Sequence, residues 1–347
     1  MKKVNLYFHK LTHWEYWSFG AVYFPLLFIW LYYALRARSL FFFNASNPSI
    51  KNGGFLMESK KEIYDIIPQA FYPKTILCSS ENDLNSVLNN AKKANIDFPF
   101  IAKPDIGMQG LAVEKIHDEQ ALKAYLDKIK VDFLVQELIS YPEEVGVFYY
   151  RFPNEKTGHI SGIVHKELLT VVGNGKDDIT QLLQKNPRFH LQLSVLQKKY
   201  GADLNQILSE NEMLTLVPYG NHARGAKFID ATHWISKKLT ETIDQICQQI
   251  PDFYYGRLDI KYNSWEELQA GKAFSIIELN GAGSEPTHIY DPKHSLFWAW
   301  REIIKHWQLL FKISTHNYKQ GHRYLSFSEG IKMFRENKAL VQKLKEF

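Results

Sequence analysis

Two neighbouring stretches in the last third of the sequence alternate charged and apolar residues. GRLDIKYN carries Arg257, Asp259 and Lys261 at every second position, and SIIELNG carries Glu278 and Asn280. A period of two places such side chains on one face of a β-strand, and the short link predicts a hairpin. If the faces agree, Asp259, Glu278 and Asn280 bring together three oxygen ligands, a set that suits Mg²⁺ held with substrate phosphates. A solvated polar face is the alternative, which the apolar neighbours of Glu278 disfavour.

A second stretch, FPFIAKPDIGMQGLAVEKI at residues 98–116, has groups that could bind phosphate. A predicted strand ends at Lys103, a loop follows with Gly107 and Gly110, and a second strand returns. Glycines let backbone N–H groups approach phosphate oxygens closely, and the lysine adds a positive charge. Loops of this kind are also common in ordinary hairpins, so this stretch is a modest signal by itself.

A third stretch, FLVQELISYPEEVGV at residues 133–147, suits a nucleoside. An apolar strand gives way to Gln136 and Glu137, and Glu144 follows. The exposed end of a strand can offer backbone groups to an adenine edge, and a carboxylate can accept hydrogen bonds from ribose hydroxyls. Taken alone, these residues would fit ordinary surface acids equally well.

The order of these motifs resembles that of the ATP-grasp superfamily. The resemblance rests on IAKPDIGMQG, on LVQELI with Glu144, on VVGNGKDDITQLL and on GRLDI…IIELNGAGSEP, and it covers roughly residues 74–312. The nearest likeness is to D-alanine–D-alanine ligases and to the ATP-grasp modules of cyanophycin synthetase-like carboxylate–amine ligases. Asn174 stands where those ligases usually have an acid, so the role of that turn does not carry over.

The resemblance implies a role in nucleotide binding for each motif in the first half of the chain. Lys103 would contact the α- and β-phosphates, and Gly107–Gly110 would form a mobile loop over them. The hinge near 136–140, with Gln136 and Glu137, would hold adenine, and Glu144 would bind ribose.

The resemblance also implies roles for residues further along the chain. Asp259, Glu278 and Asn280 match the Mg²⁺ ligands, and Arg257 matches the arginine that stabilises the transferring phosphoryl group. Lys166, in IVHKELL, would be a further phosphate contact, with an exposed strand lysine as the equal alternative. Arg224, in GNHARGAKF, could grip a carboxylate or phosphate, or be a simple loop charge.

The function implied by the resemblance is ATP- and Mg²⁺-dependent ligation of a carboxylate to an amine or, less often, a thiol, through an acyl phosphate. One alternative is a kinase of the same fold that phosphorylates a hydroxyl and stops. Another is a membrane-bound nucleotide sensor or scaffold without turnover. The identities of the acid and the amine, and the oligomeric state, do not follow from the sequence.

The N-terminal sixth of the chain differs from the rest in charge and in aromatic content. Residues 1–61 hold eight Lys and Arg residues against two acidic residues, including Lys2 and Lys3, whereas the remainder holds 34 against 35. A near-neutral body without a basic stripe disfavours nucleic acid as a partner. Of the 50 aromatic residues, 15 fall in residues 7–43.

Residues 17–35 lack a formal charge, and their length of 19 residues is close to that of a membrane span. Pro25 should break a helix there. A monotopic or re-entrant segment that touches membrane lipids at the cytoplasmic face is the first expectation, because both flanks are basic. A simple span and a buried core helix are the alternatives.

The mixture of strands and helices predicts an α+β protein without a strict βαβ rhythm. We expect a membrane-associating aromatic and basic segment over 1–60, a short α/β region over 61–98, and an ATP-grasp domain over 99–347. That domain would consist of two α+β lobes that clasp ATP and would end in helices over 295–347. Cys78 and Cys247 are the chain's two cysteines, which indicates no disulfide framework and fits a reducing compartment.

Overall fold

A four-stranded antiparallel sheet forms the smaller of two lobes in the computed structural model, which describes residues 6–108, 110–217 and 220–347. Helices α5 (Leu84–Lys93) and α6 (Glu119–Leu126) pack on it, and each begins at an aspartate that accepts a backbone hydrogen bond, Asp83 and Asp118. The strands run in the order β1 (Thr75–Cys78), β4 (Phe133–Glu137), β2 (Phe100–Pro104), β3 (Glu114–Ile116).

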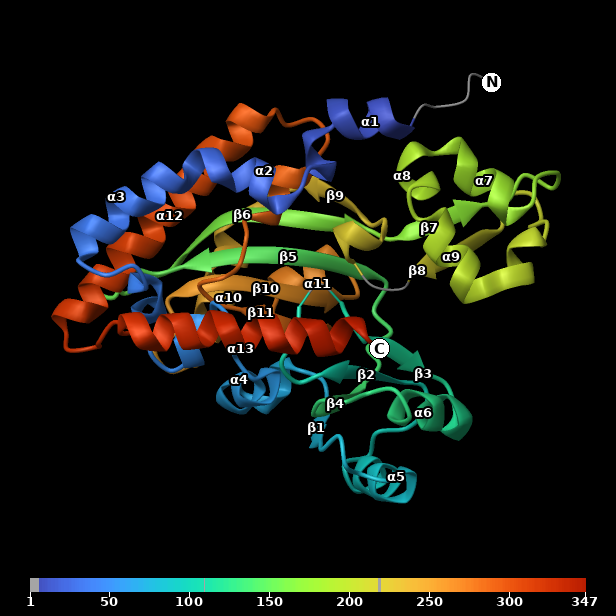
Figure 1. The fold of residues 1–347 in the computed structure, drawn as a ribbon, viewed down its shortest axis with the longest axis horizontal. Helices are drawn as coiled ribbons and strands as arrows, with labels where there is room; N and C mark the ends of the chain where they lie inside the picture. Colours follow the sequence, from blue (N-terminus) through green and yellow to red (C-terminus); the bar gives the residue numbers. More distant parts are fainter. Residues whose placement is uncertain (1–5, 109, 218–219) are drawn as a thin grey trace.

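A five-stranded antiparallel sheet forms the larger lobe (Figure 1). Val145, Val147 and Tyr149 point to one face, where α4 (Lys60–Ile66), α10 (Lys237–Cys247) and α11 (Trp265–Gln269) cover them. Phe148 points to the opposite face and packs with the long helix α12 (Leu296–Lys319). The strands run in the order β11 (Phe274–Asn280), β10 (Tyr255–Tyr262), β5 (Glu143–Tyr150), β6 (His159–Glu167), β9 (Lys227–Asp230).

A small unit with its own core projects from the larger sheet between β6 and β9 (Figure 1). It consists of the paired strands β7 (Leu169–Val172) and β8 (Met213–Val217) and the helices α7 (Ile179–Lys185), α8 (Pro187–His190) and α9 (Leu193–Tyr200). Pro187 opens α8 and Gly201 ends α9.

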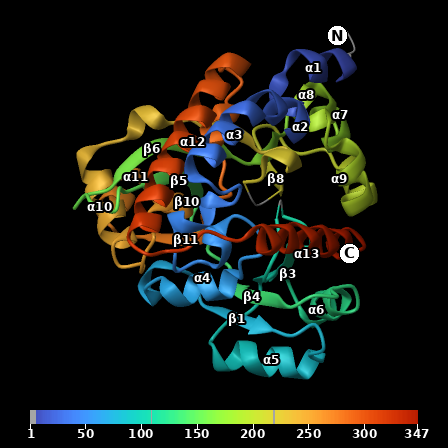
Figure 2. The same cartoon turned by 60° about the vertical axis from the view of Figure 1, so that its left-hand side comes forward.

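The N-terminal segment is helical and lies along the body. Helices α1 (Leu6–Thr12), α2 (Phe19–Tyr23) and α3 (Leu27–Ala37) follow one another, and a short 3-10 turn over Phe24–Leu26 confirms the expected break at Pro25. Helix α3 runs beside α12 in both views (Figures 1 and 2), with Tyr33 stacked on Phe311 at 5.0 Å between ring centres. The basic residues Lys2 and Lys3 lie outside the described residues.

The last helix, α13 (Phe327–Lys345), touches both lobes (Figure 2). Near its start, Met333 joins the aromatic core that includes Phe41 and Phe43. At its end, Leu344 is buried in the core of the smaller lobe, and its Cδ1 would lie 3.5 Å from a Cβ placed at Gly107. The helix therefore braces the glycine-containing loop against the larger lobe.

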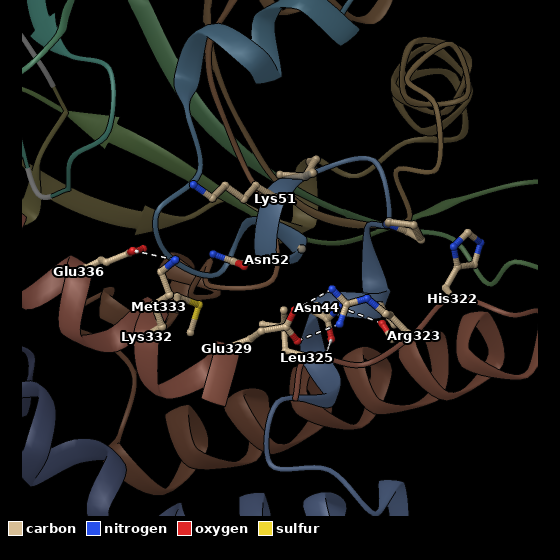
Figure 3. A pocket seen from close by; sticks show the side chains of 14 residues that line it. Asn44, Lys51, Asn52, His322, Arg323, Leu325, Glu329, Lys332, Met333 and Glu336 are labelled. Atoms are coloured by element: carbon tan, nitrogen blue, oxygen red, sulfur yellow. Dashed lines mark hydrogen bonds and ion pairs between the residues drawn. The ribbon is translucent and has the colours of Figure 1, made fainter. Parts of the chain in front are cut away.

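A hollow of about 540 Å³ separates the start of α13 from residues 44–53 (Figure 3). Arg323 lies across from Glu329 with two hydrogen bonds of 2.8 and 2.7 Å, and Lys332 lies 3.7 Å from Glu336. Asn44 ties the two walls, because its Oδ1 accepts from the backbone N–H of Leu325. The charged side chains on the α13 side of the hollow are thus paired with one another. The hollow lies at a junction whose two walls are held together by a hydrogen bond.

We expect Leu344→Ala to lower the free energy of unfolding by about 2–5 kcal/mol, because it leaves a cavity in a closed core. The exposed residue Leu35, 78% accessible, gives the matched control Leu35→Ala, which should change it little. Urea unfolding followed by circular dichroism measures both, and equal effects would contradict the bracing role of α13.

Candidate functional site

The predicted hairpin is present, and it places Asp259 directly across from Glu278. Strands β10 and β11 pair antiparallel, with Arg257 opposite Asn280 and Asp259 opposite Glu278. The register shifts after Asp259, so that Ile260 pairs with Ile276 and Ile277 is the extra residue of a β-bulge. Asp259 is 4% exposed, so the alternative of a solvated polar face is wrong for this residue.

Two basic residues hold the Asp259 carboxylate. Arg257 donates from Nε to Oδ1 at 2.9 Å and from a terminal nitrogen to Oδ2 at 3.1 Å. Lys166 Nζ lies 3.2 Å from Asp259 Oδ1 and 2.8 Å from Glu144 Oε1. Burial alone would raise the pKa of Asp259, but the charges of Arg257 and Lys166 outweigh it and hold the pKa below its usual value.

Close backbone approaches fix Lys166 and Glu144. A Cβ at Gly220 would come within 2.5 Å of Lys166 Cδ, and the Gly220 N–H donates to Glu144 Oε2 at 3.3 Å. A Cβ at Gly146 would come within 3.0 Å of Asp259 Oδ1. Lys166 is 6% exposed and Glu144 4%, so an exposed strand lysine and an ordinary surface acid are both wrong descriptions.

Lys103 reaches the same region from the smaller lobe. Its ammonium donates to the Gln136 side chain at 2.9 Å, to the Tyr64 hydroxyl at 3.0 Å and to the Ile277 carbonyl at 3.3 Å. The bulge frees that carbonyl from the strand ladder, and the Tyr64 hydroxyl also donates to it. Burial lowers the pKa of Lys103 to about 8, although Glu278 and Asp105 oppose the shift.

The glycine loop receives contacts from distant segments. Lys60 donates to the Gly107 carbonyl at 2.9 Å and lies 3.9 Å from Glu278 Oε1. Arg224 donates to the Gly110 carbonyl at 3.3 Å, so it lies at the loop. Within the predicted Gly107–Gly110 loop, Gln109 lies outside the described residues.

The predicted hinge connects the lobes, since β4 ends at Glu137 and β5 begins at Glu143. Gln136 faces inward and also donates to the Thr75 hydroxyl at 2.7 Å, whereas Glu137 is half-buried and accepts from the Lys74 backbone N–H at 3.3 Å. The adenine and ribose roles of Gln136, Glu137 and Glu144 stay predictions.

Sequence reasoning missed four residues that border this site: Glu58, Lys60, Tyr64 and Tyr23. The first three come from the segment around the start of α4, and Tyr23 donates to Glu285, whose carbonyl accepts from Arg257 at 3.2 Å. One atom of Glu58, Oε2, is buried without a hydrogen bond among the described residues, and burial raises the pKa of this carboxyl. No local sequence pattern marks them, because their partners lie far away in the chain.

A comparison with family models decides the kind of domain. Residues 60–149 match the model of the RimK-like ATP-grasp domain. These residues are therefore assigned to an ATP-grasp domain. The matched residues run from α4 to the end of β5 and so contain Lys60, Lys103, the glycine loop and Glu144. The expected ATP-grasp fold of α+β class is confirmed.

Other proteins are similar to parts of the chain. Among curated proteins, the carbamoyl phosphate synthase large chain of Brucella suis is 37% identical over 76 residues, which is 22% of this chain and 6% of that protein. Among solved structures, the D-alanine–D-alanine ligase of Bacillus anthracis has a TM-score of 0.42 at 12% identity, covering 76% of this chain and 69% of that one. The bifunctional glutathione synthetase of Pasteurella multocida has a TM-score of 0.38 at 14% identity, covering 75% and 38%.

The ATP-grasp site offers oxygen donors for a cation. Among the described residues, no group of three or more His, Cys, Asp or Glu side chains could hold a metal ion by itself. The buried side-chain nitrogen of Asn280 has no hydrogen-bond partner among the described residues, so it is a donor that an acceptor such as a phosphate oxygen would satisfy. The donor set of Asp259, Glu278 and Asn280 fits Mg²⁺, which is bound by few protein ligands when phosphates supply the others.

We expect the affinity for Mg·ADP to fall as the pH rises through about 8, because a phosphate contact needs Lys103 in its charged form. In Lys103→Arg this loss should be absent, since an arginine stays charged over that range. Calorimetric titrations from neutral pH to about pH 9.5 measure both profiles. A parallel loss of affinity in the two proteins would contradict the assignment of Lys103.

Proposed function

We propose that the protein is an ATP- and Mg²⁺-dependent ligase that joins a carboxylate to an amine through an acyl phosphate. The observation that carries the proposal is the charged face formed by Arg257, Asp259, Lys166 and Glu144, across from Lys103 of the other lobe. Positively charged side chains of the two lobes face one another in the region where a nucleoside triphosphate would bind. A thiol acceptor is the minor variant of the same chemistry.

The residues divide the work of phosphoryl transfer. Lys103, Lys60 and the glycine loop would bind the phosphates, and Arg257 would offset charge that develops on the transferring group. Asp259, Glu278 and Asn280 would hold Mg²⁺, which would supply positive charge to the phosphates. The substrate carboxylate attacks the γ-phosphorus, ADP leaves, and the amine then displaces inorganic phosphate from the acyl carbon. Bracing of the glycine loop by Lys60, Arg224 and α13 would keep water from the acyl phosphate.

We further propose that the protein acts at the cytoplasmic face of a membrane, on a substrate held there. The segment Phe19–Ala37 is long and apolar enough to cross a membrane, with a mean hydropathy of 1.4, and 22% of it is buried. Along α2, the 3-10 turn and α3, one side packs on the body while the other is exposed and apolar, with Phe19 66%, Phe24 71%, Phe28 75% and Leu35 78% accessible. These four side chains are called the apolar face below.

The packing of α3 supports a monotopic arrangement. Tyr33 stacks on Phe311, Trp30 lies 5.1 Å from Trp307, and the Arg36 guanidinium lies 5.3 Å from the Phe311 ring. A spanning helix would have to leave these partners on α12, whereas a helix that lies in the interface keeps them. The basic residues Lys10, Arg36 and Arg38 flank the apolar face and suit anionic headgroups.

We expect Glu278→Gln to lower the rate of ADP release by roughly a hundredfold or more. The substitution removes a negative charge, and several kcal/mol of transition-state stabilisation depend on that charge. Coupled-enzyme detection of ADP with a panel of acids and amines measures this, and Glu336→Gln, on α13, is the control. Unchanged turnover in Glu278→Gln would refute the site. A stable phosphorylated product that forms without an amine would indicate a kinase, and Mg·ATP binding without turnover would indicate a sensor.

We expect the triple variant Phe24→Ser, Phe28→Ser, Leu35→Ser to bind anionic phospholipid vesicles at least about a hundredfold more weakly, since each buried apolar side chain contributes roughly 1.5–3 kcal/mol. The matched control replaces Val195, Ile207 and Met213, exposed residues of the small unit, by serine. Vesicle sedimentation measures both. Equal losses, or none, would contradict a membrane role for the apolar face.

A further inference from the structure

A half-buried carboxylate lies next to the phosphoryl-transfer residues without a basic partner. The Tyr23 hydroxyl donates to Glu285 Oε1 at 2.5 Å, and the Tyr290 hydroxyl donates to the same oxygen at 3.1 Å. No Lys, Arg or His nitrogen of the described residues lies within ion-pair distance of Glu285, and Oε2 has no hydrogen bond among them. The backbone carbonyl of Glu285 accepts from Arg257, which places this residue at the edge of the transfer site.

Several buried carboxylates of the described residues are paired with a cation, although Asp105 and Asp244 are held by a backbone N–H and a tyrosine hydroxyl instead. Glu15 lies 2.7 Å from Arg188, Glu144 lies 2.8 Å from Lys166, and Asp259 is held by Arg257. Glu285 is half-buried, and its Oε2 has no hydrogen bond among the described residues, so this oxygen can still accept one. Arg257 directs two donors to the Asp259 carboxylate and one to the Glu285 carbonyl, and its charge also acts on Glu285. None of these donors reaches Oε2, so this oxygen remains open to a cation from outside the chain.

The two tyrosines orient Glu285 without neutralising it. Burial, followed by the charge of Glu285, raises the pKa of both Tyr23 and Tyr290 well above the usual value, so both remain hydrogen-bond donors. Tyr290 is held from behind, because Trp14 stacks on it at 5.5 Å and donates from Nε1 to the His294 carbonyl at 2.8 Å.

Tyr23 also connects Glu285 to the apolar face. Its ring stacks on Phe19 at 4.1 Å between ring centres, and its neighbour in sequence is Phe24. Phe19 and Phe24 are both exposed members of the apolar face. One aromatic layer therefore separates the unpaired carboxylate from the surface that we propose to lie in the membrane.

We propose that Glu285, framed by Tyr23 and Tyr290, binds the ammonium group of a membrane-held amine substrate and presents it beside Arg257. This inference rests on the proposed ligase function and names the class of its acceptor. A primary ammonium suits the site because it can donate a hydrogen bond to Oε2 as well as balance the charge. A quaternary ammonium of equal charge lacks that donor, which gives the site a means of discrimination.

The test compares two sets of phosphatidylcholine vesicles with the full-length protein and Mg·ADP. One set carries a long-chain primary alkylamine, and the other carries the trimethylammonium compound of the same chain, so the vesicle charge is equal. We expect the wild type to bind the primary-amine vesicles about tenfold or more tightly, and Glu285→Gln to lose this preference. Tyr23→Phe should weaken the preference, and Tyr318→Phe, on an exposed turn of α12, should preserve it.

Two results would overturn the inference: a wild type without preference, or a preference that survives in Glu285→Gln. If Glu285→Gln fails to fold, as thermal unfolding would show, the double variant Tyr23→Phe, Tyr290→Phe decides, because it keeps the charge and removes both donors.

Short-chain ethylamine in solution separates recognition of the amine from presentation by the membrane, and binding of ethylamine as tight as that of the vesicles would overturn the membrane part. Amine-dependent ADP release that Glu285→Gln leaves unchanged would refute the inference and leave the ligase proposal standing. Amine binding that depends on Glu285, without ADP release in the presence of any acid tested, would support the amine site and refute the ligase proposal.

Discussion

The ion cluster on the inner face of the large sheet is the constraint on which the rest of the site depends. Lys166 lies between Glu144 and Asp259, and Arg257 closes the cluster, so two cations and two anions share one buried region. Removal of any one of them would leave an uncompensated charge in a medium that solvates it poorly. The two positive and two negative charges of the cluster cancel. Glu278, across the strand pair, and Lys103 of the smaller lobe therefore remain to interact with a nucleotide and its cation.

Strand geometry explains how a stable protein can carry such a cluster. Alternate residues of β5 and β10 build the core under α10 and α11, so the opposite face is free to hold charge where α12 does not cover it. Gly146 gives the Asp259 carboxylate room against β5. The bulge at Ile277 then provides an acceptor for Lys103, and this joins the lobes through a hydrogen bond to backbone instead of a second ion pair.

The parts of the site that local patterns determine could be predicted from the sequence. The alternation in GRLDIKYN and SIIELNG placed Arg257, Asp259 and Glu278 correctly, since it reports which face a side chain takes. The contacts of Lys60 with Gly107 and of Tyr23 with Glu285 could not be predicted, because each joins segments whose meeting is decided by packing of the whole chain. The burial of Lys166 was likewise undecided, since the Gly220 loop that covers it comes from a distant segment.

The charge asymmetry of the sequence suggested two separate tasks, location or substrate delivery before about residue 74 and chemistry after it. Contacts between the N-terminal segment and the rest of the chain connect the two parts. Glu15 pairs with Arg188 of the small unit, Trp14 stacks on Tyr290, and Tyr23 donates to Glu285, whose carbonyl accepts from Arg257. A segment that only anchored the protein would need none of these contacts near the loops of the site. The same helical segment that presents an apolar face outward therefore also borders the region of Glu285 and Arg257.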